Sequence, residues 1–286
     1  MSAYRTDEGA RVLREAQTRT LEHWPVPNEQ QYVPTPEGDT FVVVSGRMDA
    51  PPLVLIHGSG SSSAHWMDRI PFLAEHFRVY AVDVIGEPGL SAASRPPLAS
   101  DTYARWLDAV LDHFELADAQ FMGYSFGGWL TLDYAIRRPH RVSRMSLFCP
   151  MGVGKQKSGF LLATILLTPF GKWGQRKALS RTLGSELSRM PADRFTATSD
   201  QIRLVSKHFR YRTGFPIFTD ENLRGLTMPI QVVVGDEDAM VDSAETASRL
   251  TSATPHAEVQ VLPRIGHLLP SRPEHELEFL TREEQP

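Results

Sequence analysis

The chain has 286 residues, of which 41% are hydrophobic and 22% are charged, and its formal net charge at pH 7 is -4. This length suits one large α/β domain, or one domain with an insertion. The even mix of acidic and basic residues, with no basic stretch interleaved with aromatics, argues against a nucleic-acid partner.

The beginning of the chain is polar from Met1 to Gly9 and does not resemble a secretory signal. The longest mostly apolar run, Phe160 to Leu167, is far shorter than the roughly 20 residues that span a bilayer. Cys149 is the only cysteine, so no disulfide framework is expected. We therefore predict a cytoplasmic protein without a membrane partner.

A helix is predicted from Glu8 to Trp24, with apolar residues toward one side and arginines toward the other. Pro25 and Pro27 are expected to stop it. The sequence leaves open whether this N-terminal extension, residues 1–30, packs on the core of its own chain or on a second copy in a homodimer.

Beyond residue 30 the pattern alternates between strands and helices. Gln31 to Val33 and Thr40 to Ser45 flank a Pro-Glu-Gly-Asp turn and predict an opening hairpin. Further strands are predicted at Leu53–Ile56, Arg78–Val82, Ala119–Met122, Val142–Phe148, Ile230–Val234 and Glu258–Leu262. Helices are predicted at Ala64–His76, Thr102–Phe114, Trp129–Ile136, Ser243–Leu250 and Pro273–Leu280. This order specifies an α/β fold with a mostly parallel, doubly wound sheet, whose ligands bind outside the carboxyl ends of the strands.

The alternation stops between Met151 and Leu226. Short segments there look helical, namely Phe160–Leu167, Gln175–Leu183 and Gln201–Phe209, and we expect glycines to break them up at positions 152, 154, 159, 171, 174 and 184. We predict a helical cap, residues 151–226, inserted into a core made of residues 31–150 and 227–286.

The stretch from Met122 to Gly128 joins a predicted strand to a predicted helix and carries the pattern Gly-x-Ser-x-Gly around Ser125. A tight strand-to-helix turn forces its central residue into a strained conformation. Side chains two positions before and two positions after Ser125 would collide with nearby backbone of the same chain, so glycine is needed at Gly123 and Gly127. Phe126 would then open the helix with a free backbone N-H, which favours negative charge near the serine oxygen.

Four motifs follow predicted strands, in this chain order: His57-Gly58, Gly123 to Gly128, Asp238 and Gly266-His267. On these motifs the chain resembles the α/β-hydrolase superfamily from about Thr40 to Leu280, with its cap inserted after the sixth strand. The order Ser, Asp, His is the order that this superfamily uses.

The resemblance implies a role for each residue. Ser125 is the expected nucleophile, His267 the base that takes its proton, and Asp238 the acid that orients the imidazole. The backbone N-H groups of Ser59 and Phe126 are the expected oxyanion donors. We call residues 57–63 the oxyanion loop.

Other residues are candidates for the roles of acid and base. Asp236 and Asp242 lie in the same loop as Asp238, which the family spacing favours. His57 and His65 flank the expected pocket, and by resemblance His57 shapes the oxyanion loop through hydrogen bonds and is not the base.

The sequence departs from the family pattern at two places. The loop from Asp83 to Ser91 has one extra residue and a proline compared with the usual Asp-x-x-Gly-x-Gly-x-Ser. The His-Gly-Ser-Gly stretch is similar to that of carbon–carbon bond hydrolases of this fold, yet Leu268 stands where those usually carry tryptophan. We therefore expect hydrolysis of a carbon–carbon bond less than hydrolysis of an ester.

No metal or cofactor is expected, because the sequence has no His-Glu-x-x-His, no paired cysteines, no phosphate loop and no dinucleotide fingerprint. The remaining chemistry is hydrolysis of a carboxylic ester, thioester or lactone through an acyl-enzyme. Alternatives within the fold are a small-molecule receptor or a non-hydrolytic enzyme, such as a cyclase or a haloperoxidase-like protein.

The predicted cap is rich in apolar and basic residues. The apolar ones favour a small, partly apolar substrate, although packing of cap on core explains most of them. The basic ones raise the hypothesis of an anionic substrate or an acidic carrier protein, against the simpler interpretation of a solvated helical face.

Overall fold

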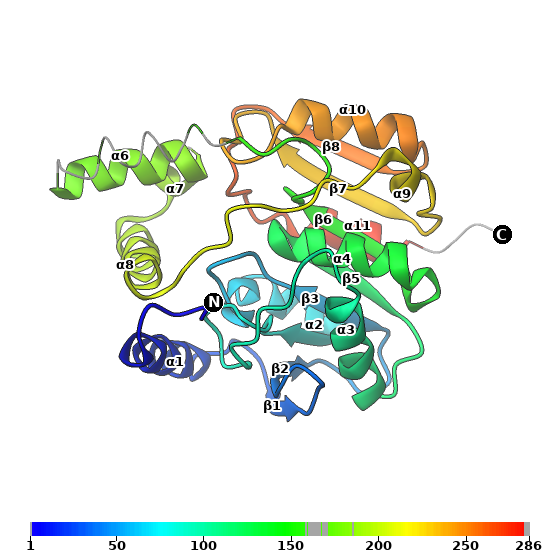
Figure 1. Cartoon of the computed structure of the whole chain (residues 1–286), viewed down its shortest axis with the longest axis horizontal. Helices are drawn as coiled ribbons and strands as arrows, with labels where there is room; N and C mark the ends of the chain where they lie inside the picture. Colours follow the sequence, from blue (N-terminus) through cyan, green and yellow to red (C-terminus); the bar gives the residue numbers. More distant parts are fainter. Residues whose placement is uncertain (1, 158, 160–166, 168–170, 185, 283–286) are drawn as a thin grey trace.

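The computed structural model describes residues 2–157, 159, 167, 171–184 and 186–282. Within these residues, eight strands form one sheet in the order β1-β2-β4-β3-β5-β6-β7-β8 (Figure 1). The strands are β1 (Asn28–Val33), β2 (Thr40–Ser45), β3 (Pro52–Ile56), β4 (Arg78–Val82), β5 (Ala119–Tyr124), β6 (Val142–Phe148), β7 (Ile230–Gly235) and β8 (Glu258–Leu262). β2 runs antiparallel to β1 and β4, and every other neighbouring pair is parallel. The predictions of an opening hairpin and a mostly parallel sheet are confirmed.

Helices cover both faces of this sheet, because successive side chains of a strand point to opposite faces. On β2, Val42 and Val44 join one hydrophobic core, whereas Phe41 and Val43 join the other. The first core lies under α3 (Thr102–His113), α4 (Phe126–Arg137), α9 (Asp220–Arg224) and α10 (Ser243–Ala253). The second lies under α2 (Ile70–His76) and α11 (Pro273–Thr281). Burial on both faces accounts for the continuously apolar central strands.

The N-terminal helix α1 (Asp7–Leu21) is shorter than predicted. It ends three residues before Trp24, because that side chain turns into the second core and its indole N-H donates to the hydroxyl of Ser45 (3.0 Å). The helix packs on α8 (Ala192–His208) and on the 3-10 turn Ser63–Trp66. α1 therefore has packing partners within its own chain.

The prediction of one continuous helix from Ala64 to His76 is wrong. The chain forms the 3-10 turn Ser63–Trp66 and then α2, with Pro71 in the first turn of α2. Proline has no N-H to donate and clashes with the preceding turn, so it is tolerated only where a helix begins. The proline therefore sets the start of α2.

The described part of the chain between β6 and β7 contains α6 (Gly171–Leu183), α7 (Glu186–Arg189), α8 and α9. Gly174 lies inside α6, so the prediction that it breaks a helix is wrong. Gly184 does follow the end of α6, with a φ of +97° that suits glycine. The predicted helix Phe160–Leu167 lies outside the described residues except for its last residue.

The helices α6 and α7 lie side by side at one end of the sheet, and α8 lies between them and α1 (Figure 1). We keep the name cap for residues 151–226, which remains our interpretation of this segment. Across the described ranges, none of the helices combines the length and the apolar character needed to cross a membrane.

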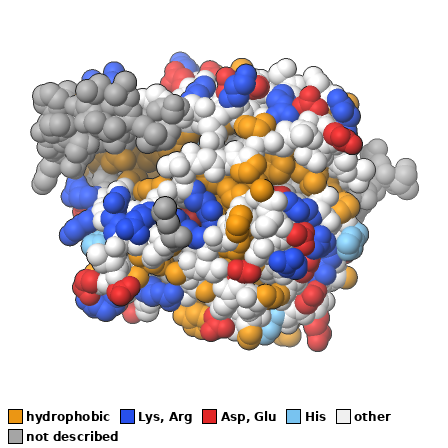
Figure 2. Space-filling model, in the orientation of Figure 1, with side chains coloured by type: hydrophobic (Ala, Val, Ile, Leu, Met, Phe, Trp, Pro, Cys, Tyr) orange, Lys and Arg blue, Asp and Glu red, His pale blue; other side chains and the backbone are white. Residues whose placement is uncertain are grey.

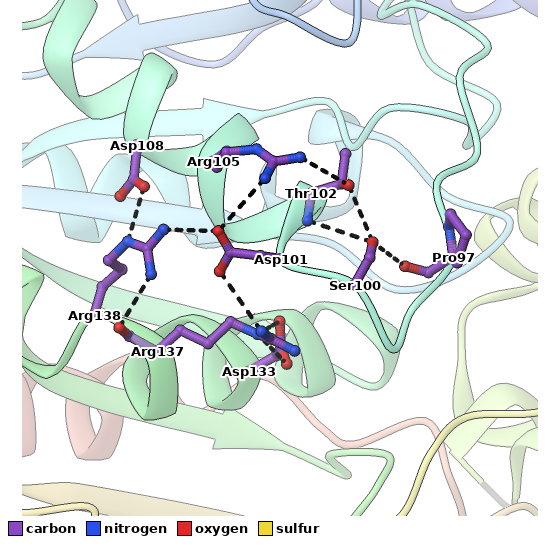
Figure 3. A network of polar contacts seen from close by, with 9 residues as sticks. All are labelled: Pro97, Ser100, Asp101, Thr102, Arg105, Asp108, Asp133, Arg137 and Arg138. Carbon is purple, nitrogen blue, oxygen red and sulfur yellow. Dashed lines mark hydrogen bonds and ion pairs between the residues drawn. The ribbon is translucent and has the colours of Figure 1, made fainter.

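A network of ion pairs holds the end of α4 that lies away from Ser125 (Figure 3). Arg138 donates to Asp108 on α3 (2.9 Å) and to Asp101 at the start of α3 (3.0 Å). Arg137 lies 3.6 Å from Asp101. Positive charge is also favoured at the carboxyl end of a helix. The network thus fixes α4 against α3.

Candidate active site

Ser125 lies on the turn between β5 and α4, where the backbone is strained. Its φ is +53° and its ψ is -108°, a conformation that side-chain-bearing residues rarely adopt. A Cβ atom on Gly127 would lie 2.0 Å from the carbonyl oxygen of Ile56, and one on Gly123 would lie 2.7 Å from the carbonyl oxygen of Gly127. The prediction that this turn needs both glycines is confirmed.

Three side chains from distant parts of the sequence meet at this turn. His267, in the loop between β8 and α11, has Nε2 3.0 Å from Oγ of Ser125 and Nδ1 2.7 Å from Oδ2 of Asp238. The other carboxyl oxygen of Asp238, which follows β7, accepts the backbone N-H groups of Met240 (2.7 Å) and Val241 (3.0 Å). An imidazole held in this way can take the proton of the serine hydroxyl.

The environment keeps Asp238 ionised. Burial by itself would raise its pKa, but the charge and hydrogen bond of His267 and the two backbone N-H groups lower the pKa of Asp238 below its ordinary value. The rival carboxylates are used elsewhere: Asp236 accepts a backbone N-H of the neighbouring loop (2.6 Å), and Asp242 caps the start of α10 (3.0 Å). A carboxylate at Nδ1 favours the tautomer that leaves Nε2 free to accept a proton.

The two other histidines near the turn are differently engaged. His57 donates from Nδ1 to the carbonyl oxygen of Gly58 (2.8 Å) and accepts at Nε2 from the backbone N-H of Val84 (2.9 Å). Burial lowers its pKa, so the ring is neutral and both nitrogens are occupied. This agrees with the expectation that His57 shapes the oxyanion loop. Burial also lowers the pKa of His65 to about 3, and its ring packs on Tyr124 with centroids 4.6 Å apart.

The two predicted oxyanion donors belong to the residue that follows Ser125 and to the loop that packs on Ser125. The oxyanion loop packs directly on it, since a Cβ atom on Gly58 would lie 3.4 Å from the Cβ of Ser125. Ser59 follows Gly58, and Phe126 is the first residue of α4. Among the residues that the structure describes, neither the N-H of Ser59 nor that of Phe126 has a hydrogen-bond partner. Free donors in this position can stabilise a negatively charged oxygen.

Tyr124 makes a contact that the sequence does not reveal. Its buried hydroxyl donates to the carbonyl oxygen of His267 (2.6 Å) and accepts from the backbone N-H of Leu269 (2.9 Å). The residue directly before Ser125 thus holds the loop that carries His267. Nothing in the motif indicates this, because the partners lie more than a hundred residues further along the chain.

Cys149 is buried at the end of β6, as expected of a packing residue. In the described part of the chain it belongs to one group of possible metal ligands, with Asp238 and His267, whose ligand atoms lie within 4.8 Å of one another. Burial, and the nearby charge of Asp238, raise the pKa of the Cys149 thiol well above its usual value. A thiol that stays protonated is a poor metal ligand.

The loop from Asp83 to Ser91, where the sequence departs from the family pattern, folds around Asp83. Its Oδ1 accepts the backbone N-H of Ser63 in the oxyanion loop (2.6 Å). Gly86 has a φ of +73°, which glycine adopts readily and which permits a tight turn in this loop. The turn brings the side chain of Glu87 inward, where it is fully buried.

A doubly wound parallel sheet, with a serine on a strained strand-to-helix turn beside a histidine and a carboxylate, defines the class of α/β hydrolases. The model of the Alpha/beta hydrolase family matches residues 53–278. The chain belongs to this family, so the resemblance inferred from the motifs is confirmed.

Several members of known structure or name are similar over most of their length. Carboxylesterase YbfK of Bacillus subtilis (strain 168) is 30% identical over 261 residues, which cover 89% of this chain and 87% of its own. The crystal structure of naproxen esterase (carboxylesterase NP) from Bacillus subtilis has a TM-score of 0.82 at 26% identity, covering 96% of this chain and 99% of that one. A 2-hydroxy-6-oxo-2,4-heptadienoate hydrolase of Pseudomonas putida is 27% identical over 237 residues, covering 76% of this chain and 82% of its own.

Proposed function

We propose that the protein is a serine hydrolase that cleaves a carboxylic ester, thioester or lactone of a small, partly apolar substrate. The observation that carries the proposal is the row of contacts from Ser125 to His267 (3.0 Å) and from His267 to Asp238 (2.7 Å). Relatives named as carboxylesterases support ester bonds as the target.

The reaction runs through an acyl-enzyme. Ser125 attacks the carbonyl carbon while Nε2 of His267 takes its proton, and Asp238 stabilises the resulting imidazolium. The negative charge on the carbonyl oxygen is met by the backbone N-H groups of Ser59 and Phe126. The alcohol or thiol leaves with the proton from His267, and a water molecule deprotonated by the same imidazole then releases the acid from Ser125.

Exposed apolar side chains, two of them within the cap, support an apolar substrate. Figure 2 shows hydrophobic side chains along the middle of one face of the molecule. Tyr211 and Ile217, on the segment that returns from α8 toward β7, are 43% and 46% exposed. Exposed apolar groups of this kind favour an ester with a hydrophobic acyl or alcohol part.

Some of the basic residues of the cap serve internal contacts. Arg210 donates to a backbone carbonyl of the N-terminal segment (2.8 Å), and Arg212 donates to the hydroxyl of Tyr103 (2.7 Å). These two guanidinium groups make hydrogen bonds within the chain. We therefore take a small molecule, and not an acidic carrier protein, as the substrate to test first.

Burst kinetics with a short-chain p-nitrophenyl ester test the proposal. Ser125→Ala should lower kcat/KM by on the order of 10³-fold or more, and Asp238→Asn by a similar factor. The matched control Asp236→Asn changes a neighbouring carboxylate that does not touch His267, and should stay within about twofold of wild type. Equal, slow hydrolysis by wild type and Ser125→Ala would refute the proposal and favour a receptor or a non-hydrolytic enzyme. Turnover of a carbon–carbon substrate with no turnover of esters would also refute it.

A further inference from the structure

Glu87 is fully buried after β4, although the reaction proposed above does not use it. Its Oε2 accepts a hydrogen bond from the backbone N-H of Gly60 (2.6 Å) and another from the hydroxyl of Ser59 (3.0 Å). These donors are adjacent in the chain. One carboxyl oxygen therefore fixes both the backbone and a side chain of the oxyanion loop.

The fixed segment is the one that carries a proposed oxyanion donor. On one side of the Ser59 N-H, Gly58 packs on Ser125, and on the other side Gly60 is bound to Glu87. The orientation of the Ser59 N-H is thus set by an anchor at each neighbouring residue. Glu87 is connected to the reacting atoms through this one loop.

The oxyanion loop has little else at this point to hold it. Across the described residues, Glu87 is the one hydrogen-bond partner of the Ser59 hydroxyl and of the Gly60 N-H. Gly60 has a φ of +74°, and a Cβ atom there would lie 2.3 Å from a ring carbon of Tyr211. Glycine permits this close packing but leaves the backbone free to adopt many conformations.

Burying this carboxyl group is unfavourable in itself. Its second oxygen, Oε1, has no hydrogen-bond partner among the described residues, and Nη2 of Arg95 lies 3.7 Å away. An apolar side chain would fill the same space without the loss of hydration. What an apolar side chain cannot supply is the pair of hydrogen bonds to the oxyanion loop.

We propose that Glu87 is a positioning residue, whose carboxyl group holds the oxyanion loop so that the N-H of Ser59 points at the oxygen that becomes negative. The inference rests on the proposed function, because it assigns Glu87 to that same site. The side-chain contacts of Glu87 among the described residues are to Ser59, Gly60 and Arg95, and not to Ser125, Asp238 or His267, so its effect on the reaction passes through the loop.

The charge of Glu87 changes near neutral pH. Burial raises its pKa to about 7, against the lowering effects of Gly60, Arg95, Ser59 and Arg212. The hydrogen bonds from Gly60 and Ser59 lower this pKa, so they are stronger to the ionised carboxylate, and we expect them to hold the loop more firmly above this pH, although burial of the charge makes the folded state as a whole less stable there. Burial also raises the pKa values of the facing tyrosines, so none of them titrates near neutrality: Tyr4, Tyr103 and Tyr211.

Kinetics of two Glu87 variants provide the first test. Glu87→Ala should lower kcat by about 10- to 100-fold and change KM by less than about threefold, because an oxyanion donor acts mainly in the transition state. Glu87→Gln keeps an acceptor oxygen and should restore kcat to within about fivefold of wild type. The matched control is Glu37→Ala, whose carboxyl accepts from Ser94 (2.8 Å) and should leave both constants unchanged.

Hydrogen exchange of the same proteins without substrate provides a readout that does not depend on turnover. The peptide covering residues 57–63 should exchange faster in Glu87→Ala than in wild type, and at the wild-type rate in Glu87→Gln at neutral pH. Its protection, corrected for intrinsic exchange, should rise from about pH 6 to pH 8 in wild type and stay level in Glu87→Gln. The comparison of wild type with Glu87→Gln tests the role of Glu87 even if Glu87→Ala does not fold.

The outcomes separate the two proposals. Unchanged kcat together with unchanged loop exchange in Glu87→Ala overturns the role of Glu87, and so does an identical pH response of the loop in wild type and Glu87→Gln. Faster loop exchange in Glu87→Ala supports the role. If the wild type hydrolyses esters no faster than Ser125→Ala, the proposed function fails, while the exchange measurements still decide whether Glu87 holds the loop.

Discussion

Replacing Glu87 by glutamine should change how the stability of the protein depends on pH. Burial raises the pKa of this carboxyl group from its ordinary value of 4.5 to about 7 in the folded protein, and unfolding returns it to the ordinary value. The folded state therefore holds the proton more tightly. The stabilising contribution is complete below about pH 4.5 and is lost as the pH rises toward 7.

The structure sets the size of this effect. Each pH unit between the two pKa values corresponds to about 1.4 kcal/mol, so a pKa that rises from 4.5 to about 7 corresponds to about 3 kcal/mol. Solvent does not screen the effect, since Glu87 is fully buried. The variant Glu87→Gln cannot ionise and should not lose this stability.

Urea unfolding followed by tryptophan fluorescence, from about pH 4.5 to 8.5, measures the effect. The unfolding free energy of Glu87→Gln relative to wild type should increase by about 3 kcal/mol up to about pH 7 and remain constant above it. For Glu37→Gln, a change at a partly exposed glutamate, the difference in unfolding free energy from wild type should not change with pH across the same range. If the difference for Glu87→Gln also does not change with pH, the raised pKa is refuted, because Glu87 would then keep an ordinary pKa in the folded state.

Three further substitutions test the framework of the site. Tyr124→Phe removes the hydroxyl that binds the His267 loop, so kcat should fall about tenfold and the unfolding free energy by about 1 to 2 kcal/mol; an unchanged kcat would contradict this. Gly127→Ala would place a Cβ atom 2.0 Å from the carbonyl oxygen of Ile56, so we expect a lower thermal midpoint and no kinetic burst, and a normal burst would show that the turn tolerates a side chain. Arg138→Ala should lower stability by about 1 kcal/mol in dilute buffer and less in high salt, with ester hydrolysis unchanged; a loss independent of salt would mean that packing, and not charge, holds the end of α4.

The sheet and the meeting of the proposed catalytic residues follow from local features of the sequence. Short apolar strands alternate with amphipathic helices, which favours a parallel sheet and brings the carboxyl ends of its parallel strands to one edge. Residues that directly follow strands, such as Ser125 and Asp238, must then lie at that edge. The glycines around Ser125 are equally local, because the steric conflict they avoid arises within the turn itself.

Features that depend on distant contacts could not be read in this way. Gly174 looks like a break, but a glycine inside a helix costs only about 1 kcal/mol, and α6 continues through it. Tyr124 looks like an ordinary buried aromatic until its hydroxyl is seen between His267 and Leu269. Glu87 looks like a surface residue in a polar loop, since the sequence gives no sign that its side chain turns inward.

The oxyanion loop shows why such contacts matter for the site. A loop rich in glycine and serine can approach Ser125 closely, yet for the same reason it has few side chains with which to order itself. Its order is supplied from elsewhere: Asp83 binds the N-H of Ser63 (2.6 Å), and Gln17 of α1 accepts the hydroxyl of Ser62 (2.6 Å). Gln17 precedes the segment that matches the family model, residues 53–278. The N-terminal helix therefore belongs to the support of the site, although the family motifs give no reason to look for it there.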